Sequence, residues 1–277
     1  MERKRMDKEK WPLVIGKIRT MKPLVYNITN NVVSNFTANG LLAIGASPVM
    51  AIAPQEAACM ASKANALVLN IGTLDERLIE AMLLAGKSAN EHGIPVVLDP
   101  VGIGATSYRT ETVRMLLREL KVDIIRGNAA EIGTIAGNIY KMKGVDSTID
   151  TEGFLEVATE VASKYESVVV VTGKRDIIAD SVGDKIFISN GHAMMTKVTG
   201  TGCLLSAVIG AAASVEKDYA SAATAALTYY NIAGEKAARK AGKHGTGSFQ
   251  VEFINELSNL SHIHWIHEAM AEEVIQS

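Results

Sequence analysis

The sequence predicts an α/β fold of three layers, in which a central, mostly parallel sheet lies between two layers of helices. Short apolar runs rich in β-branched residues alternate with helical stretches, which is the pattern of β-α-β units. The runs are apolar almost without interruption, as strands covered on both faces must be. Beyond residue 200 the pattern is helical only. One such domain can reach the length of this chain, 277 residues.

The parallel part of the sheet follows from the apolar runs and from the helices between them. Residues 75–92 illustrate such a helix, because Leu78, Met82 and Ala85 fall on one face. Strands joined by right-handed helical crossovers become parallel neighbours. The expected strands are residues 24–28, 48–52, 66–71, 95–98, 122–125 and 167–171.

A hairpin and a run of helices are expected after these strands. Residues 176–180 and 185–189 flank a turn that contains Gly183, and this hairpin should extend one edge of the sheet. The helical tail is expected at residues 200–213, 219–241 and 248–260.

The start of the chain differs in composition from the rest. Charged residues dominate it as far as Trp11. We therefore expect residues 1–15 to form a flexible N-terminal arm and residues 16–277 to form a single domain.

The amino-acid composition argues against nucleic acid and membranes as partners of the protein. Lys and Arg number 28 and Asp and Glu 30, so the formal charge of −2 provides no positive field for nucleic acid or for an anionic membrane. No apolar run reaches the roughly 18 residues of a membrane span. The two cysteines, Cys59 and Cys203, do not form a disulfide or zinc motif. A soluble protein of the reducing cytoplasm is expected.

Polar or glycine-rich segments follow the expected strands, at the edge where open parallel sheets bind their ligands. The most informative is Gly200-Thr201-Gly202-Cys203, because it precedes a long apolar helix. Backbone N–H groups and the helix dipole at such a start favour a bound anion. The alternative is a loop whose glycines only permit tight turning.

Two acidic residues could help to hold Mg²⁺ beside phosphate groups. Asn128 and Glu131 open a helix after a strand, with a spacing that places amide and carboxylate on one face. Asp99 ends another strand. Magnesium prefers oxygen ligands and often keeps its water, so one or two carboxylates suffice. The alternative is helix capping by Asn128 and Glu131, and loop capping by Asp99.

Arg126 also lies at a strand end, where its guanidinium could donate to the phosphate oxygens of a nucleotide. The alternative for this residue is a side chain that faces solvent.

Together, these segments resemble a known superfamily. Asn128 and Glu131, followed by Gly200-Thr201-Gly202, are similar to the NxxE and GxGD signatures of ribokinase-like kinases. Further segments, over roughly residues 22 to 260, resemble the successive motifs of the hydroxyethylthiazole kinase family. They are residues 27–33, 45–50, 70–73, 98–102, 126–131 and 196–203.

The resemblance implies a ribokinase-like fold and the phosphorylation of a thiazole alcohol, 4-methyl-5-(2-hydroxyethyl)thiazole, by ATP with Mg²⁺ in thiamine synthesis and salvage. It also implies a homotrimer whose sites are shared between subunits. By matching motif, Met50, Asn30 and Gly200 would bind the substrate, and Arg126, Thr172 and Asn128 would bind ATP. Asp99 and Glu131 would organise Mg²⁺. Gly200, Thr201 and Gly202 would donate N–H groups to the transferring phosphoryl group.

Cys203 departs from the superfamily pattern, because most ribokinase-like kinases have an aspartate base at this position. A thiol with an ordinary pKa of about 8.5 is a poor base at neutral pH. Phosphoryl transfer depends mainly on positioning and on charge stabilisation, so slow turnover is expected.

Three other functions stay open at this point. One is a related kinase for another vitamin-precursor alcohol, such as pyridoxal or hydroxymethylpyrimidine, although Met50 and the segment 27–31 argue against it. A second is a nicotinamide-nucleotide hydrate dehydratase of the same superfamily. The third is a sensor of thiazole or nucleotide without catalysis.

Overall fold

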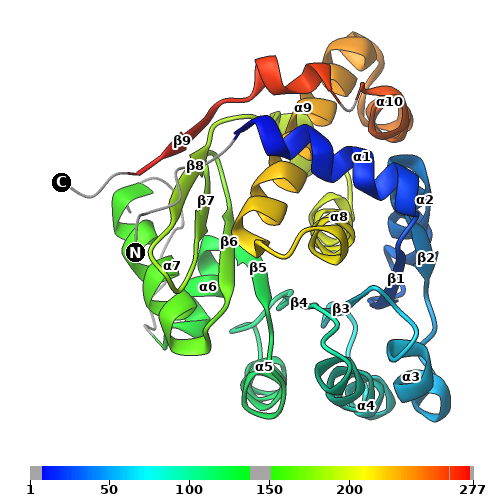
Figure 1. Ribbon diagram of the computed structural model, residues 1–277, viewed down its shortest axis with the longest axis vertical. Coiled ribbons are helices and arrows are strands. Elements are labelled where there is room, and N and C mark those ends of the chain that lie inside the picture. Colours follow the sequence, from blue (N-terminus) through cyan, green and yellow to red (C-terminus); the bar gives the residue numbers. More distant parts are fainter. Residues whose placement is uncertain (1–7, 138–150, 262, 275–277) are drawn as a thin grey trace.

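The computed structural model describes residues 8–137, 151–261 and 263–274 (Figure 1). In this part of the chain the strands form one nine-stranded sheet in the order β2-β1-β3-β4-β5-β6-β7-β8-β9. Neighbours from β2 to β6 are parallel, and β6 to β9 are antiparallel. The strands are β1 Leu24–Ile28, β2 Ser47–Val49, β3 Ala66–Asn70, β4 Val96–Asp99, β5 Ile124–Asn128, β6 Val168–Thr172, β7 Asp176–Ala179, β8 Lys185–Ile188 and β9 Ala271–Glu273.

Helices cover both faces of the sheet, which confirms the predicted three layers (Figure 1). One layer contains α1, α2, α8, α9 and α10, and the other contains α3 to α7. None of the described helices has the length and apolar character of a membrane span. The helices are α1 Trp11–Met21, α2 Ser34–Ile44, α3 Pro54–Ala61, α4 Glu76–Glu91, α5 Ser107–Glu119, α6 Ala129–Ile135, α7 Thr151–Tyr165, α8 Thr201–Val215, α9 Tyr219–Ala241 and α10 Thr246–Asn259.

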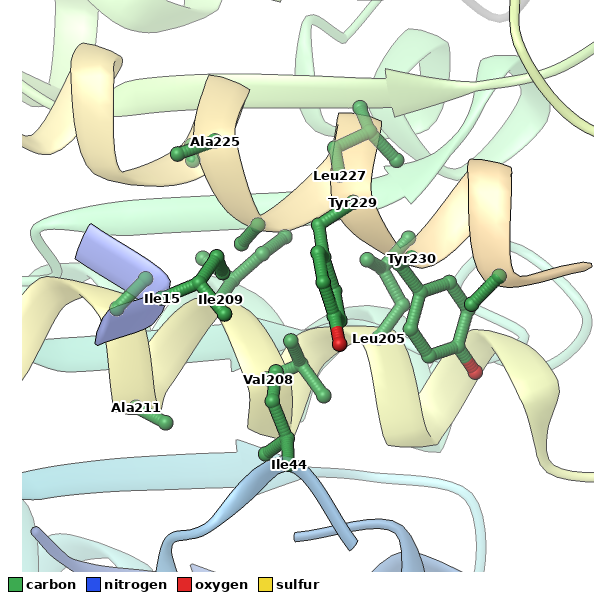
Figure 2. Close-up of a cluster of buried hydrophobic side chains, with 14 of the residues drawn as sticks. Ile15, Ile44, Leu205, Val208, Ile209, Ala211, Ala225, Leu227, Tyr229 and Tyr230 are labelled. Carbon is green, nitrogen blue, oxygen red and sulfur yellow. The ribbon is translucent and has the colours of Figure 1, made fainter. Parts of the chain in front are cut away.

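The two cores lie on opposite faces of the same strands, because successive side chains of a strand point to opposite sides. Val68 lies in the core on the side of α8, whereas its neighbour Leu67 lies in the core on the side of α4. Figure 2 shows Tyr230 of α9 directed toward α8, where its hydroxyl donates to the carbonyl of Thr201, and both helices contribute small alanines to the core between them. This packing fixes the start of α8 at the edge of the sheet.

Two expectations about the ends of the chain were wrong. Residues 11–15 do not belong to a flexible arm, because they open α1 and Trp11, Val14 and Ile15 are buried. The charged residues around them hid this apolar helix face. The tail is not helical only, since β9 pairs antiparallel with β8. The predicted hairpin is present as β7 and β8, and β9 extends the sheet beyond it.

The remaining predicted strands are confirmed, with shifts in their bounds. The strand predicted at residues 122–125 is β5, Ile124–Asn128, so Arg126 lies inside the strand and not at its end. β2 covers Ser47–Val49, so it is shorter than the predicted 48–52 and starts earlier. Met50 therefore follows β2 instead of lying inside it.

Candidate active site

The carboxyl ends of the parallel strands bring the predicted polar residues to one edge of the sheet. Asp99 ends β4, Asn128 ends β5 and Thr172 ends β6, while Asn30 follows β1. The helices α6 and α8 begin at this edge. The edge is therefore lined by side chains from several strands and by two helix N-termini.

The start of α8 has the features of an anion site. Gly200 adopts a φ of +95°, a region that only glycine enters readily, and α8 has no side-chain cap. A Cβ on Gly200 would lie 3.0 Å from the side chains of Phe36 and Val33. The Thr201 hydroxyl donates to the carbonyl of Met195 and so leaves the backbone N–H groups of the first turn uncapped.

Arg126 lies directly against this helix start. A Cβ on Gly202 would approach Arg126 Nη1 to 2.8 Å, so any larger residue would displace the guanidinium from this position. Arg126 Nη2 donates to Thr172 Oγ1 at 2.6 Å, and Nη1 lies 3.8 Å from Asp99 Oδ2. The Arg126 side chain is only 11% exposed, so it does not face solvent.

A hydrogen-bonded row of side chains links Asp99 to Cys203. Asn70 Nδ2 donates to Asp99 Oδ2 at 2.8 Å, and Asn70 Oδ1 accepts from Asn30 Nδ2 at 2.9 Å. Asn30 Nδ2 also lies 3.5 Å from Cys203 Sγ. Ser206 of α8 donates to the same Asp99 oxygen at 2.9 Å. The row connects the segment after β1 with β3, β4 and α8.

Burial controls the charge state of both ends of this row. Burial raises the pKa of Asp99 to about 6, although the Arg126 guanidinium lowers it, and Glu131 adds to the rise. Burial, with the Asp99 charge, raises the pKa of the Cys203 thiol to about 11. At neutral pH Cys203 is thus a protonated thiol.

Glu131 forms a capping box with Asn128 at the start of α6. Its Oε2 accepts from Asn128 N at 2.8 Å, and Asn128 Oδ1 accepts from Glu131 N at 2.9 Å. Its other oxygen, Oε1, accepts from Gly102 N at 2.9 Å. The predicted capping by Asn128 and Glu131 is present, and each carboxylate oxygen keeps one lone pair for a further donor or a metal-bound water.

A pocket of about 590 Å³ opens beside Arg126. Burial raises the pKa of Asp176, in its wall, to about 6. The pocket extends from the start of α8 past β6 to the segment that follows β8. Its lining comprises Arg126, Asn128, Thr172, Gly173, Lys174, Asp176, Asn190, Gly191, His192, Ala193, Met195, Thr196, Thr201, Gly202, Leu205, Tyr230 and Asn231.

Comparison with known proteins decides the family. The sequence model of the hydroxyethylthiazole kinase family matches residues 15–263. The chain belongs to the hydroxyethylthiazole kinase family. A solved structure of a hydroxyethylthiazole kinase from Pyrococcus horikoshii OT3 is 38% identical, with a TM-score of 0.87 over 96% of this chain and 99% of that chain.

More distant structures share the fold of this kinase. A ribokinase-like superfamily protein from Enterococcus faecalis V583 is 13% identical, with a TM-score of 0.58 over 85% of this chain and 87% of that chain. An ADP/ATP-dependent NAD(P)H-hydrate dehydratase from Bacillus subtilis, co-crystallised with ATP and Mg²⁺, is 14% identical, with a TM-score of 0.56 over 86% and 90% of the two chains. The predicted fold and family are confirmed.

The kinase brings most of the predicted site residues into two adjoining groups. Arg126, Asn128, Thr172, Thr201 and Gly202 line the pocket. Asn30, Asp99 and Cys203 belong to the hydrogen-bonded row, which Arg126 joins to the pocket. Gly200 precedes α8 and Glu131 lies in α6. Met50 follows β2 at the same edge, is half-buried and does not line the pocket.

Four polar residues of the site in this kinase were not predicted from its sequence. Asn70 ends β3, and a polar residue at the carboxyl end of a parallel strand indicates a place in the site, although no role was predicted for it. Ser206 and Asn231 are polar residues on apolar faces of α8 and α9, and Asp176 opens β7. Their partners come from other elements, which the sequence pattern does not specify.

Proposed function

We propose that this kinase transfers the γ-phosphoryl group of ATP to the hydroxyl group of 4-methyl-5-(2-hydroxyethyl)thiazole, which yields ADP and the thiazole phosphate for thiamine synthesis and salvage. The observation that carries the proposal is the meeting of Arg126, the uncapped start of α8 and Asp99 at one edge of the sheet. Family membership supports both the substrate and the use of ATP.

The residues at this edge fit a nucleotide with its metal ion. Two buried polar atoms here, Asp99 Oδ1 and Arg126 Nε, have no hydrogen-bond partner among the described residues, and Gly202, without a side chain, lets the guanidinium lie against the start of α8. Arg126, Thr172 and Asn128 would hold the nucleotide. Asp99 and Glu131 would orient Mg²⁺ through its water, and the ion supplies positive charge that offsets the phosphate oxygens.

The protein contributes mainly positioning and charge stabilisation. The N–H groups of Gly200, Thr201 and Gly202 are oriented before any substrate binds, so they can stabilise negative charge on the transferring group without reorganisation. The substrate oxygen forms a bond to phosphorus while the bond between phosphorus and the bridging oxygen of ADP breaks, and the hydroxyl proton leaves to water. We assign no proton transfer to Cys203, because its pKa of about 11 keeps it protonated.

The acceptor alcohol would bind near Asn30, Met50 and Gly200, as the family resemblance implies. We also propose a homotrimer with sites shared between subunits, and a cytoplasmic location, which the free Cys59 and Cys203 support. Light scattering of the purified protein measures the assembly directly, and a monomer would contradict the shared site.

An ADP-release screen over small vitamin-precursor alcohols with MgATP tests the activity. We expect hydroxyethylthiazole to give the highest kcat/KM. A faster reaction with pyridoxal or hydroxymethylpyrimidine would favour the related kinases. Conversion of hydrated NADH without a phosphorylated alcohol would favour the dehydratase, and binding without ADP release would favour a sensor.

A further inference from the structure

Asp176 is a buried carboxylate in the pocket wall that the reaction described above does not use. It is the first residue of β7 and is 5% exposed. Its Oδ1 accepts from Gly173 N at 2.9 Å, and its Oδ2 accepts from Asn231 Nδ2 at 2.7 Å. Both donors also line the pocket.

The first of these bonds fixes the turn between β6 and β7. Gly173 directly follows Thr172, whose hydroxyl accepts from Arg126 Nη2 at 2.6 Å. The position of Gly173 therefore affects where β6 ends. Through Thr172 it also affects where the guanidinium lies that faces the start of α8. Asp176 is thus connected to Arg126 through two residues of one turn.

The second bond connects the turn to α9 and to the segment after β8. Asn231 Nδ2 donates not only to Asp176 but also to the backbone carbonyl of Asn190 at 3.0 Å. Asn190 and the next residue, Gly191, line the pocket. One carboxylate therefore joins three walls of the pocket, which come from three separate parts of the chain.

Only a group that accepts two hydrogen bonds fits between these donors. Asn231 must direct its NH₂ group at both Asp176 and the Asn190 carbonyl, so its orientation is fixed. An amide at position 176 could still accept from Gly173, but its own NH₂ would then face the NH₂ of Asn231. The carboxylate charge is directed at protein donors, which limits its repulsion of a bound polyanion.

We propose that Asp176 is a positioning residue for the phosphoryl donor, because it holds the three pocket walls at the spacing that the nucleotide requires. The inference rests on the proposed function, since it takes the pocket as the nucleotide site. Asp176 acts through Thr172, Arg126 and the Asn190 segment, and the acceptor alcohol is bound elsewhere. Loss of Asp176 should thus weaken nucleotide binding selectively.

The test compares Asp176→Asn with Asp123→Asn in the full chain. Asp123 is a matched control, because it is also a buried carboxylate that accepts from a backbone amide, Val96 N at 2.9 Å. It directly precedes β5 and so lies at the amino end of this strand, whereas the pocket lies at the carboxyl ends of the strands. The readouts are the Kd of a non-hydrolysable ATP analogue with Mg²⁺ by calorimetry at pH 8, and the KM values for ATP and hydroxyethylthiazole.

We expect Asp176→Asn to raise the Kd of the analogue and the KM for ATP about tenfold, the effect of one lost hydrogen bond to a charged group. The KM for the alcohol and all constants of Asp123→Asn should stay at wild-type values. An unchanged Kd in folded Asp176→Asn, or equal losses in both variants, would overturn the inference.

A second variant decides the case in which Asp176→Asn does not fold. Asn231→Ala removes the connection to α9 and to Asn190 but keeps the Asp176 carboxylate, and it should also raise the Kd of the analogue selectively. Wild-type affinity in Asn231→Ala would overturn the inference. A wild-type protein that does not bind the analogue at all would instead refute the nucleotide site, and with it the proposed function.

Discussion

The amide nitrogen of Asn30 lies 3.5 Å from the sulfur of Cys203. This donor is held in place, because Asn30 Nδ2 also donates to Asn70 and Asn30 Oδ1 accepts from Val33 N. Sulfur is a weak acceptor, and the thiol stays protonated at neutral pH because burial raises the pKa of Cys203 to about 11. A better acceptor at position 203 would find its hydrogen-bond donor already in place.

Cys203→Asp should therefore preserve or raise kcat. A carboxylate there would accept from Asn30, would lie in the first turn of α8 where negative charge is favoured, and could take the substrate proton. General-base catalysis typically contributes about 10²-fold or more, which bounds the gain. Steady-state kinetics measure kcat. Cys59→Asp on the exposed face of α3 is the control, and a collapse of kcat in folded Cys203→Asp would contradict the account.

Asn70→Asp should lower kcat/KM by about tenfold or more. The change keeps the shape of the side chain but replaces the Nδ2 donor with an oxygen that faces Asp99 Oδ2 at 2.8 Å. Asn27→Asp is the matched control, because Asn27 is also buried and, within the described part of the chain, its amide nitrogen donates to the carbonyl of Val25 alone. Equal kcat/KM values in the two folded variants would show that the row from Asp99 to Cys203 plays no part in the reaction.

Glu131→Gln should weaken the dependence on Mg²⁺. The amide removes the charge and also loses one of the two backbone amide donors, Gly102 N or Asn128 N, at a cost of about 1 to 3 kcal/mol in stability. A titration of initial rate against Mg²⁺ concentration measures the effect, with protein stability followed in parallel. A titration curve identical to that of the wild type would remove Glu131 from the metal site.

Gly202→Ala should raise the KM for ATP. The new methyl group would lie 2.8 Å from Arg126 Nη1, so the guanidinium must move away from the start of α8. Gly210→Ala in the same helix is the control, because its methyl group would meet Val68 in the core instead. We expect the control to lose stability while its KM for ATP is unchanged. The same KM in both variants would argue against a role for Arg126 in nucleotide binding.

The pH dependence of stability should reveal the buried Asp176. Burial raises its pKa from 3.8 to about 6, so the folded state binds more protons than the unfolded state in this range. Its contribution to the free energy of unfolding is complete below about pH 4 and is lost as the pH rises to about 6. By linkage, the free energy of unfolding of the wild type should fall by up to about 3 kcal/mol more than that of Asp176→Asn across this interval. The free energy of unfolding is measured by denaturation at several pH values. The same pH dependence in the wild type and in Asp176→Asn would contradict the raised pKa of Asp176.

The place of the site could be predicted from the sequence, because the carboxyl ends of parallel strands lie at the same edge of the sheet. Asp99 and Thr172 end β4 and β6, and Arg126 directly follows the apolar residues at the start of β5, so their meeting follows from the sheet. The contact between Asn70 and Asp99 depends in addition on strand register, since these two residues are paired across β3 and β4. Register is set by packing, which the pattern of one strand does not reveal.

Other features depend on contacts between distant segments. Asp176 and Asn231 are brought together by the rotation of α9 about its axis, and α9 is apolar on so many sides that its sequence does not fix that rotation. The strand β9 has no alternating apolar pattern. It forms because β8 offers an unpaired edge, and the pairing is antiparallel.

A crystal structure with Mg²⁺, a non-hydrolysable ATP analogue and hydroxyethylthiazole tests the central claim most directly. The account predicts the terminal phosphate at the N–H groups of residues 200–202, with Arg126 on a phosphate oxygen and the metal ion between the phosphates, Asp99 and Glu131. A triphosphate bound away from the start of α8, or a metal ion remote from both carboxylates, would contradict it.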